Sequence, residues 1–471
     1  MESPNDRLDR LSAVDAQFLT NENENSHMHI GAVMIFAGEP PTYDELKAHI
    51  ESRLQFVPRY RQKLVYPPLG TGRPLWADDP SFNLNYHMRH TALPAPGSDR
   101  ELIALASRVF SQGLDRSKPL WEMFLVEELE GDRFAIIIKS HHAMIDGISG
   151  VDIGTVIFDI TPDADPVPTE KPWAPEPEPS QLNLLKRTAG DLTTTPLRLG
   201  EKALGAVRNP SSLADRVGDG AEGLAEVARA FADAAPSGPL NVTIGPHRRI
   251  AWTRAELDRF RRIKDVFGTT VNDVVLAVTA GAIRRWLIER GEETEGLELR
   301  AMVPVSVRGD DERGQLGNKL TTMRAPLPVY EPDPVARLEI VSAAMDGLKQ
   351  SKQALGAEVI ARLNDFAPPT LLAQAARLTF STRLFNLLVT NVPGPQIPLY
   401  VLGRKLIQPM PIAFLAKNHA LAVGVMSYDG EVNIGLIGDY DAMPDIRTVA
   451  EGIDLSLDEL TAAAEQVESS I

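Results

Sequence analysis

The stretch RFAIIIKSHHAMIDGISGVDIG, residues 133–154, joins an apolar run to a cluster of polar residues. The run Phe134–Ile138 is short, apolar and rich in isoleucine, which is typical of a buried β-strand. Three residues later stand His141 and His142, followed closely by an Asp-Gly pair. The chain has nine histidines among 471 residues, so two adjacent histidines just after a buried strand indicate a candidate site.

Three interpretations of this motif, residues 141–147, follow from the residues alone. The histidines can be hydrogen-bonded core residues, with Asp146 and Gly147 forming a plain turn. His142 and Asp146 are four residues apart and can share a metal ion, although such sites usually have a third protein ligand. Alternatively, His142 can act as a base, because a histidine pKa of ~6.5 lets the neutral ring accept a proton near pH 7. The residues alone do not choose among these interpretations.

Composition narrows the classes of function. The chain has no cysteine, which excludes disulfides, thiolate metal sites and cysteine nucleophiles. Its 48 basic and 64 acidic residues give a net charge of −16, whereas a nucleic-acid-binding protein normally has a basic excess. We found no apolar stretch near the ~18–20 residues of a membrane-spanning helix. These properties predict a cytoplasmic protein, either soluble or peripheral to a membrane, without a nucleic-acid partner.

A proline-rich stretch divides the chain. Residues 161–180 contain seven prolines in twenty positions, which disfavours helix and interior strand and predicts an extended tether. Alanine, leucine and charged residues follow up to about residue 235 and indicate connecting helices. Strand and helix patterns alternate on both sides. We therefore expect an α/β protein with an N-terminal lobe at 1–160, a tether and connector at 161–240, and a C-terminal lobe at 241–471.

The motif H-H-x-x-x-D-G after a strand resembles the hallmark of acyl-CoA-dependent O-acyltransferases related to chloramphenicol acetyltransferase and to peptide-synthetase condensation domains. Other stretches, in order along nearly the whole chain, resemble the bacterial wax ester synthase/diacylglycerol acyltransferase family. They are LSAVDAQFL, GRPLWADDPSFNLNYHMRHTALPAPG, LDRSKPLWE, TTVNDVVLA, MVPVSVR, LGNKL, NVPGP and MSYDGEVNIGLIGD. The resemblance implies a two-lobed chloramphenicol-acetyltransferase-like fold, with an active-site tunnel between the lobes.

The resemblance also implies a reaction. Such an enzyme esterifies diacylglycerol or a long-chain fatty alcohol with the acyl group of a long-chain acyl-CoA, giving triacylglycerol or wax ester. His142 would be the general base and coenzyme A the leaving group, with no acyl-enzyme, no metal and no cofactor beyond acyl-CoA as co-substrate. His141, Asp146 and Gly147 would support the base, with Arg308 as the salt-bridge partner of Asp146.

Two further motifs have a structural and a functional interpretation. Pro119, Leu120 and Trp121 resemble the family's P-L-W, which is thought to shape a substrate pocket, but a buried tryptophan at an element boundary explains them equally well. Asn272 and Asp273 suit the start of a helix, where their side chains accept from free N–H groups. The resemblance implies that this pair also faces the site.

The oily substrates imply contact with a membrane or lipid droplet, so the resemblance predicts a protein peripheral to the inner membrane or to droplets. Residues 369–388 combine apolar side chains with two arginines and no acid, although a core helix explains them as well. The locally basic connector at 182–208 is a second candidate. Alternatives to the main assignment are a carrier-protein-bound donor, another lipid hydroxyl as acceptor, or an inactive relative that only binds.

Overall fold

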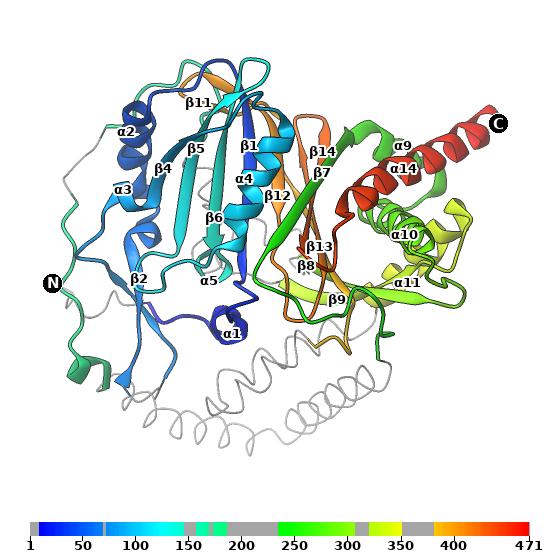
Figure 1. The fold of residues 1–471 in the computed structure, drawn as a ribbon, viewed down its shortest axis with the longest axis horizontal. Coiled ribbons are helices and arrows are strands. Elements are labelled where there is room, and N and C mark those ends of the chain that lie inside the picture. Colours follow the sequence, from blue (N-terminus) through cyan, green and yellow to red (C-terminus); the bar gives the residue numbers. More distant parts are fainter. Residues whose placement is uncertain are drawn as a thin grey trace, which may run out of the picture.

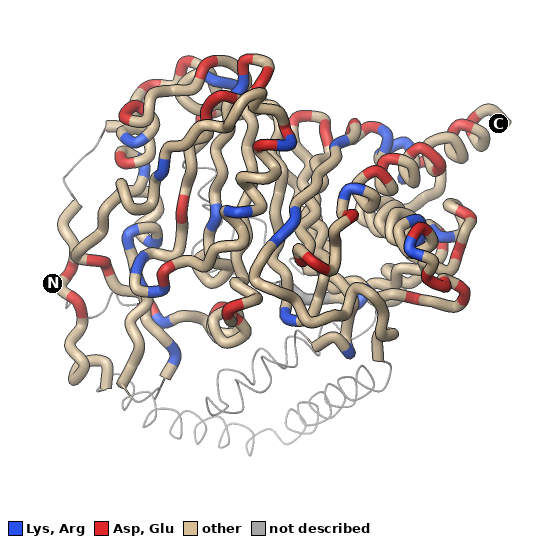
Figure 2. The backbone as a smooth tube through the Cα atoms, viewed as in Figure 1, with Lys and Arg blue, Asp and Glu red and all other residues tan. Residues whose placement is uncertain are grey.

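A computed structural model describes residues 9–68, 72–145, 157–168, 173–185, 234–306, 320–350 and 381–470 (Figure 1). Two six-stranded mixed sheets form the centre of two lobes. The strand order is β11-β12-β1-β6-β5-β4 in the first sheet and β7-β14-β13-β10-β8-β9 in the second. Acidic and basic residues are interspersed along both lobes (Figure 2).

The strands of the first sheet are β1 (His29–Ala37), β4 (Met88–Ala92), β5 (Trp121–Leu129), β6 (Arg133–His141), β11 (Tyr400–Val401) and β12 (Arg404–Ile412). The helices of this lobe are α1 (Ala13–Asn21), α2 (Tyr43–Arg53), α3 (Leu84–His87), α4 (Asp99–Ser111) and α5 (His142–Ile145), and β2 (Gln62–Val65) pairs with β3 (Leu75–Asp78) in a small separate sheet.

The strands of the second sheet are β7 (Arg248–Glu256), β8 (Glu298–Ser306), β9 (Leu320–Pro328), β10 (Leu387–Pro393), β13 (Leu421–Tyr428) and β14 (Glu431–Asp439). Its helices are α9 (Leu257–Phe267), α10 (Val271–Glu289), α11 (Pro334–Gln350) and α14 (Ile446–Ser469), and they lie on one side of the sheet (Figure 1).

Strand β6 is the predicted buried strand. It lies between β1 and β5, and every residue after Arg133 is buried. Ile136 and Ile138 belong to the core on one face of the sheet, while Ala135 and Ile137 belong to the core on the other face. Burial on both faces explains why the sequence shows a continuous apolar run instead of an alternating pattern.

The first sheet includes chain from both halves of the sequence. Strand β12 pairs antiparallel with β1, so residues expected to belong wholly to the C-terminal lobe complete the N-terminal sheet. β12 also lies over the second sheet, where Gly424 and Gly435 stand opposite each other on β13 and β14 beneath Pro411. A Cβ atom on Gly435 would lie 1.9 Å from the Pro411 carbonyl oxygen, so only glycine fits this crossing.

A shared core joins the two lobes. It contains residues of α4, β1 and β6 together with residues of β7, β12 and β14. The helix α4 contributes Val109 and Phe110, and the second sheet contributes Ile250 and Ile437. Because apolar side chains of both lobes are buried against one another, the position of one lobe constrains the other.

The described part of the tether lies along the first lobe. Asp159 forms a bridge with Tyr400 and an ion pair with Arg53, and the backbone N–H of Glu176 donates to Asp78 at 3.0 Å. The expected connector lies mostly outside the described residues.

No single helix in the described ranges is long and apolar enough to cross a membrane. One pair, α9 and α10, meets the length and hydropathy criteria together but is bent by 102°.

Candidate active site

The two histidines lie where β6 ends and α5 begins. The backbone N–H of His141 donates to the Leu120 carbonyl at 2.9 Å, and that of His142 donates to the Met28 carbonyl at 3.0 Å. The chain segments before β5 and β1 therefore fix the backbone of both histidines. Leu120, predicted from the P-L-W motif, belongs to this support through its carbonyl.

His141 is fully buried and held in one tautomer. Its Nδ1 accepts a hydrogen bond from the backbone N–H of Ala143 at 3.1 Å, which assigns the ring proton to Nε2. Burial, together with the neighbouring His142, lowers the pKa of His141 to about 3. The ring is therefore a neutral donor at Nε2.

His142 lies between two aromatic rings. Phe18 of α1 stacks on it, with ring centroids 3.9 Å apart and an angle of 16°, and Phe414 contacts it edge-on at 5.6 Å and 89°. Burial lowers the pKa of His142 to about 4, against a smaller opposite effect of its own backbone. Near pH 7 the ring is neutral and has a free lone pair for a proton.

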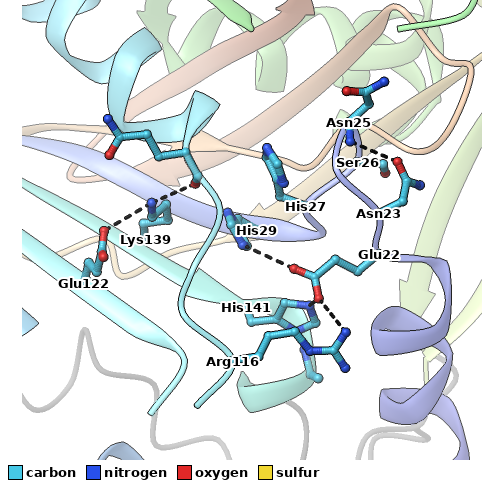
Figure 3. A network of polar contacts seen from close by, with 12 residues as sticks. Glu22, Asn23, Asn25, Ser26, His27, His29, Arg116, Glu122, Lys139 and His141 are labelled. Atoms are coloured by element: carbon cyan, nitrogen blue, oxygen red, sulfur yellow. Dashed lines mark hydrogen bonds and ion pairs between the residues drawn. The ribbon is translucent and has the colours of Figure 1, made fainter. Parts of the chain in front are cut away.

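Glu22, at the C-terminal end of α1, was not predicted from the sequence. Its Oε2 lies 3.3 Å from Nη1 of Arg116 and 3.7 Å from Nε2 of His141, and its Oε1 lies 3.9 Å from Nε2 of His29 (Figure 3). Burial raises the pKa of Glu22 to about 7, although Arg116 lowers it in part. The sequence does place Glu22 four residues after Phe18, which puts both on one face of a helix. This spacing points to the site only once the structure shows α1 beside the two histidines.

Trp121 has the contacts of a core residue. It is completely buried, its Nε1–H donates to the Tyr60 carbonyl at 2.8 Å, and it stacks on His87 with centroids 4.7 Å apart. These contacts fit the structural interpretation of Pro119–Trp121. A pocket role for the motif stays a prediction.

Asn272 and Asp273 lie at the start of α10, as predicted. Asp273 accepts from the backbone N–H of Thr270 at 2.9 Å, which completes a capping box, while Asn272 accepts from the side chain of Asn391 at 3.4 Å. The helix-start interpretation is confirmed. That the pair faces His142 stays a prediction.

Asp146, Gly147 and Arg308 lie outside the described residues. The proposed ion pair between Asp146 and Arg308 therefore stays a prediction, as does the shared metal site of His142 and Asp146. Within the described ranges, no three His, Asp or Glu side chains converge as metal ligands would.

A small cavity lies between the lobes, beside the contacts of Glu22 with His29 and His141. The cavity is lined by His27, Met28, His29, Phe110, Arg248, Phe414, Leu415 and Ile437. Phe414 therefore contacts both the cavity and His142. Arg248 is buried, and its guanidinium donates to the carbonyls of Gly245, His247 and Asn25. The bond to Asn25 ties β7 of the second lobe to the turn that follows α1.

The whole chain is similar to known proteins. The model of the wax ester synthase/diacylglycerol acyltransferase catalytic domain matches residues 11–275, and that of the WS/DGAT C-terminal domain matches residues 316–461. A probable diacylglycerol O-acyltransferase of Mycobacterium tuberculosis is 32% identical over 474 residues, covering 97% of this chain and 99% of the relative. Another from the same organism is 29% identical over 465 residues, covering 98% and 97%.

Solved structures show the same fold. The wax ester synthase/diacylglycerol acyltransferase from Marinobacter aquaeolei VT8 matches with a TM-score of 0.68 and 28% identity, over 97% of this chain and 100% of the other. The starter condensation domain of rhizomide synthetase matches with a TM-score of 0.59 and 14% identity, over 98% and 95%. The second likeness concerns the fold alone, and together they confirm the predicted two-lobed, condensation-domain-like architecture.

Proposed function

The chain belongs to the wax ester synthase/diacylglycerol acyltransferase family and is an O-acyltransferase, and we propose that it esterifies diacylglycerol or a long-chain alcohol with the acyl group of a long-chain acyl-CoA. One observation carries the assignment of the base. His142 is a neutral histidine held between Phe18 of the first lobe and Phe414, which follows the strand shared between the lobes.

In the proposed reaction, His142 takes the proton of the acceptor hydroxyl as its oxygen attacks the thioester carbonyl. The tetrahedral intermediate then collapses, the C–S bond breaks, and the coenzyme A thiolate takes the proton from the imidazolium. The products are an ester and free coenzyme A, and the histidine returns to its neutral form. The transfer is direct, with acyl-CoA as co-substrate and no further cofactor.

The two aromatic rings support this chemistry in a second way. Phe18 covers one face of the His142 ring and Phe414 contacts the ring at right angles, so these two side chains limit the access of water to the base. Exclusion of water favours transfer to an alcohol over hydrolysis of the thioester. The apolar rings also suit acyl and alkyl chains.

We also propose peripheral contact with a lipid surface, because both acceptors partition into membranes or droplets. The basic connector at 182–208 is the preferred contact segment. Replacement of Lys186 and Arg187 by glutamate is expected to reduce co-flotation with liposomes containing anionic lipid. Unchanged flotation would exclude these residues from the contact.

The reaction can be tested by coenzyme A release from palmitoyl-CoA, with dioleoylglycerol or hexadecanol as acceptor. A thiol reagent detects the product without background because the chain has no cysteine. The variant His142→Ala is compared with His90→Ala. His90 is a half-exposed histidine on the edge strand β4, and its partner is Glu127 on β5. Lipid products are identified by chromatography.

Acceptor-dependent release that is lost in His142→Ala and kept in His90→Ala is the expected result. Release that survives in a folded His142→Ala variant would refute the base. Absence of release with either acceptor would refute the proposed donor and acceptors, and would favour a carrier-bound donor or a binding role.

A further inference from the structure

One helix contacts both histidines. Phe18 lies on α1 and Glu22 caps its C-terminal end one turn later, where the backbone N–H of Glu22 donates to the Phe18 carbonyl at 3.0 Å. Residues four apart on a helix share one face. On this face Phe18 stacks on His142, while the Glu22 carboxylate faces His141 (Figure 3).

The Glu22 carboxylate faces the protonated ring nitrogen of His141. Because Nδ1 of His141 accepts from Ala143, the proton is on Nε2, which is the atom 3.7 Å from Oε2 of Glu22. The Glu22 side chain is only 9% exposed and is held from the other side by Arg116 at 3.3 Å. Arg116 in turn donates to the hydroxyl of Tyr66 at 2.6 Å. The carboxylate therefore faces a ring N–H across a distance longer than a hydrogen bond.

We propose that Glu22 is a positioning residue for the acyl transfer: it orients His141 from α1 and, through that neighbouring ring, favours the protonated form that His142 adopts during the reaction. The inference rests on the proposed function, because it assumes that His142 carries a proton in the transition state. A carboxylate that orients a catalytic histidine directly stabilises its protonated form, and in this arrangement the carboxylate would act through the neighbouring ring.

The charges around Glu22 support this role. The groups that face it are Arg116 after α4, His29 on β1 and His141 on β6, and burial lowers the pKa of both histidines well below the usual range. Both rings are therefore neutral, and the ionised Glu22 faces one cation, Arg116. Lys139, also on β6, is paired with Glu122 at 3.2 Å. His142 lowers the pKa of His141, so the two rings are close enough to interact electrostatically. We therefore expect a negative charge beside His141 to favour the protonated form of His142.

The test compares Glu22→Gln and Glu22→Asp with Glu122→Gln. Glu122 is a matched control because it is also a buried carboxylate of the first lobe, but its partners are Lys139 and Arg89. The rate constant kcat for coenzyme A release and the KM of both substrates are measured between about pH 5.5 and about pH 9. Because the pKa of Glu22 is raised to about 7, kcat of the native protein is expected to rise with pH around that value.

In Glu22→Gln this rise is expected to disappear, with kcat about 10- to 100-fold lower at high pH and little change in KM. Glu22→Asp, which keeps the charge on a shorter side chain, is expected to keep the rise and an intermediate kcat. Glu122→Gln is expected to keep the native pH profile even if it lowers the stability. A native profile in Glu22→Gln, or the same loss in Glu122→Gln, would overturn the proposal.

A second measurement does not depend on turnover. The pKa of His142 is followed by NMR on histidine-labelled protein and assigned with His142→Ala. It is expected to be lower in Glu22→Gln than in the native protein and unchanged in Glu122→Gln. Equal values in all three proteins would refute the inference even if the transferase activity is demonstrated. A lower value in Glu22→Gln would support it even if palmitoyl-CoA is not the donor.

Discussion

Replacement of Gly435 by alanine is expected to destabilise the protein far more than the same change at Gly424, its cross-strand neighbour. The new Cβ atom would lie 1.9 Å from the Pro411 carbonyl oxygen at position 435, but 3.2 Å from it at position 424. Ordinary contact begins at 3.4 Å, so β12 would have to move about 1.5 Å in the first variant and only about 0.2 Å in the second. The obstacle is backbone, which cannot rotate away as a side chain does.

Overpacking of this kind costs about 1–3 kcal/mol of unfolding free energy. We expect about 3 kcal/mol for Gly435→Ala and about 1 kcal/mol or less for Gly424→Ala. Gly347 is an internal control, because it lies exposed in α11 with no atom within 4 Å of its added Cβ. Alanine is favoured over glycine in a helix, so Gly347→Ala is expected to stabilise the protein by about 0.5–1 kcal/mol.

Urea unfolding followed by tryptophan fluorescence measures these differences, with comparison restricted to variants of equal m-value. The same displacement reaches the site, because Phe414 follows β12 by two residues and contacts His142. A shift near 1 Å at such a contact lowers the rate by about 100-fold. If Gly435→Ala matched Gly424→Ala in both midpoint and coenzyme A release, β12 would not cross β14 at this distance and the reasoning would be wrong.

Three further predictions concern single polar interactions. Trp121→Phe removes the buried hydrogen bond from Nε1 to the Tyr60 carbonyl and is expected to lower the unfolding free energy in urea by about 1–3 kcal/mol. Thr270→Ala removes the side-chain cap of α10 and is expected to cost about 1 kcal/mol in the same assay. Folding raises the pKa of Glu22 from 4.5 to about 7, so up to about 3 kcal/mol of stability is present below pH 4.5 and lost as the pH rises through about 7. Urea titrations from about pH 5 to about pH 8 should show this decline in the native protein and not in Glu22→Gln; stability and kcat then change in opposite directions with pH.

The sequence predicted what local pattern determines. The isoleucine run before the two histidines is a buried strand, and the Asn272-Asp273 pair begins a helix, because both depend on residues a few positions apart. The proline-rich tether was visible from composition in the same way. For the histidine pair, the pattern indicated a candidate site but left its chemistry open among three interpretations.

Contacts between distant segments could not be predicted from pattern. Nothing in residues 404–412 indicates that they pair with β1, because an apolar strand fits either sheet equally well. Glu22 is a similar case, since an isolated glutamate after a short helix is normally solvated. Only the packing of α1 against α5, which directly follows β6, brings its carboxylate to His141, more than a hundred residues later in the chain.

The pairing of β1 with β12 has a consequence for folding during synthesis on the ribosome. Roughly 370 residues separate the two strands, and at about 5–20 residues per second their synthesis takes about 20–70 s. During that interval β6 can cover one edge of β1, while the other edge offers its unpaired N–H and C=O groups to any neighbouring nascent chain. The N-terminal half therefore carries an unpaired strand edge until residue 412 emerges, and a chain truncated before β12 is expected to aggregate instead of forming a folded lobe.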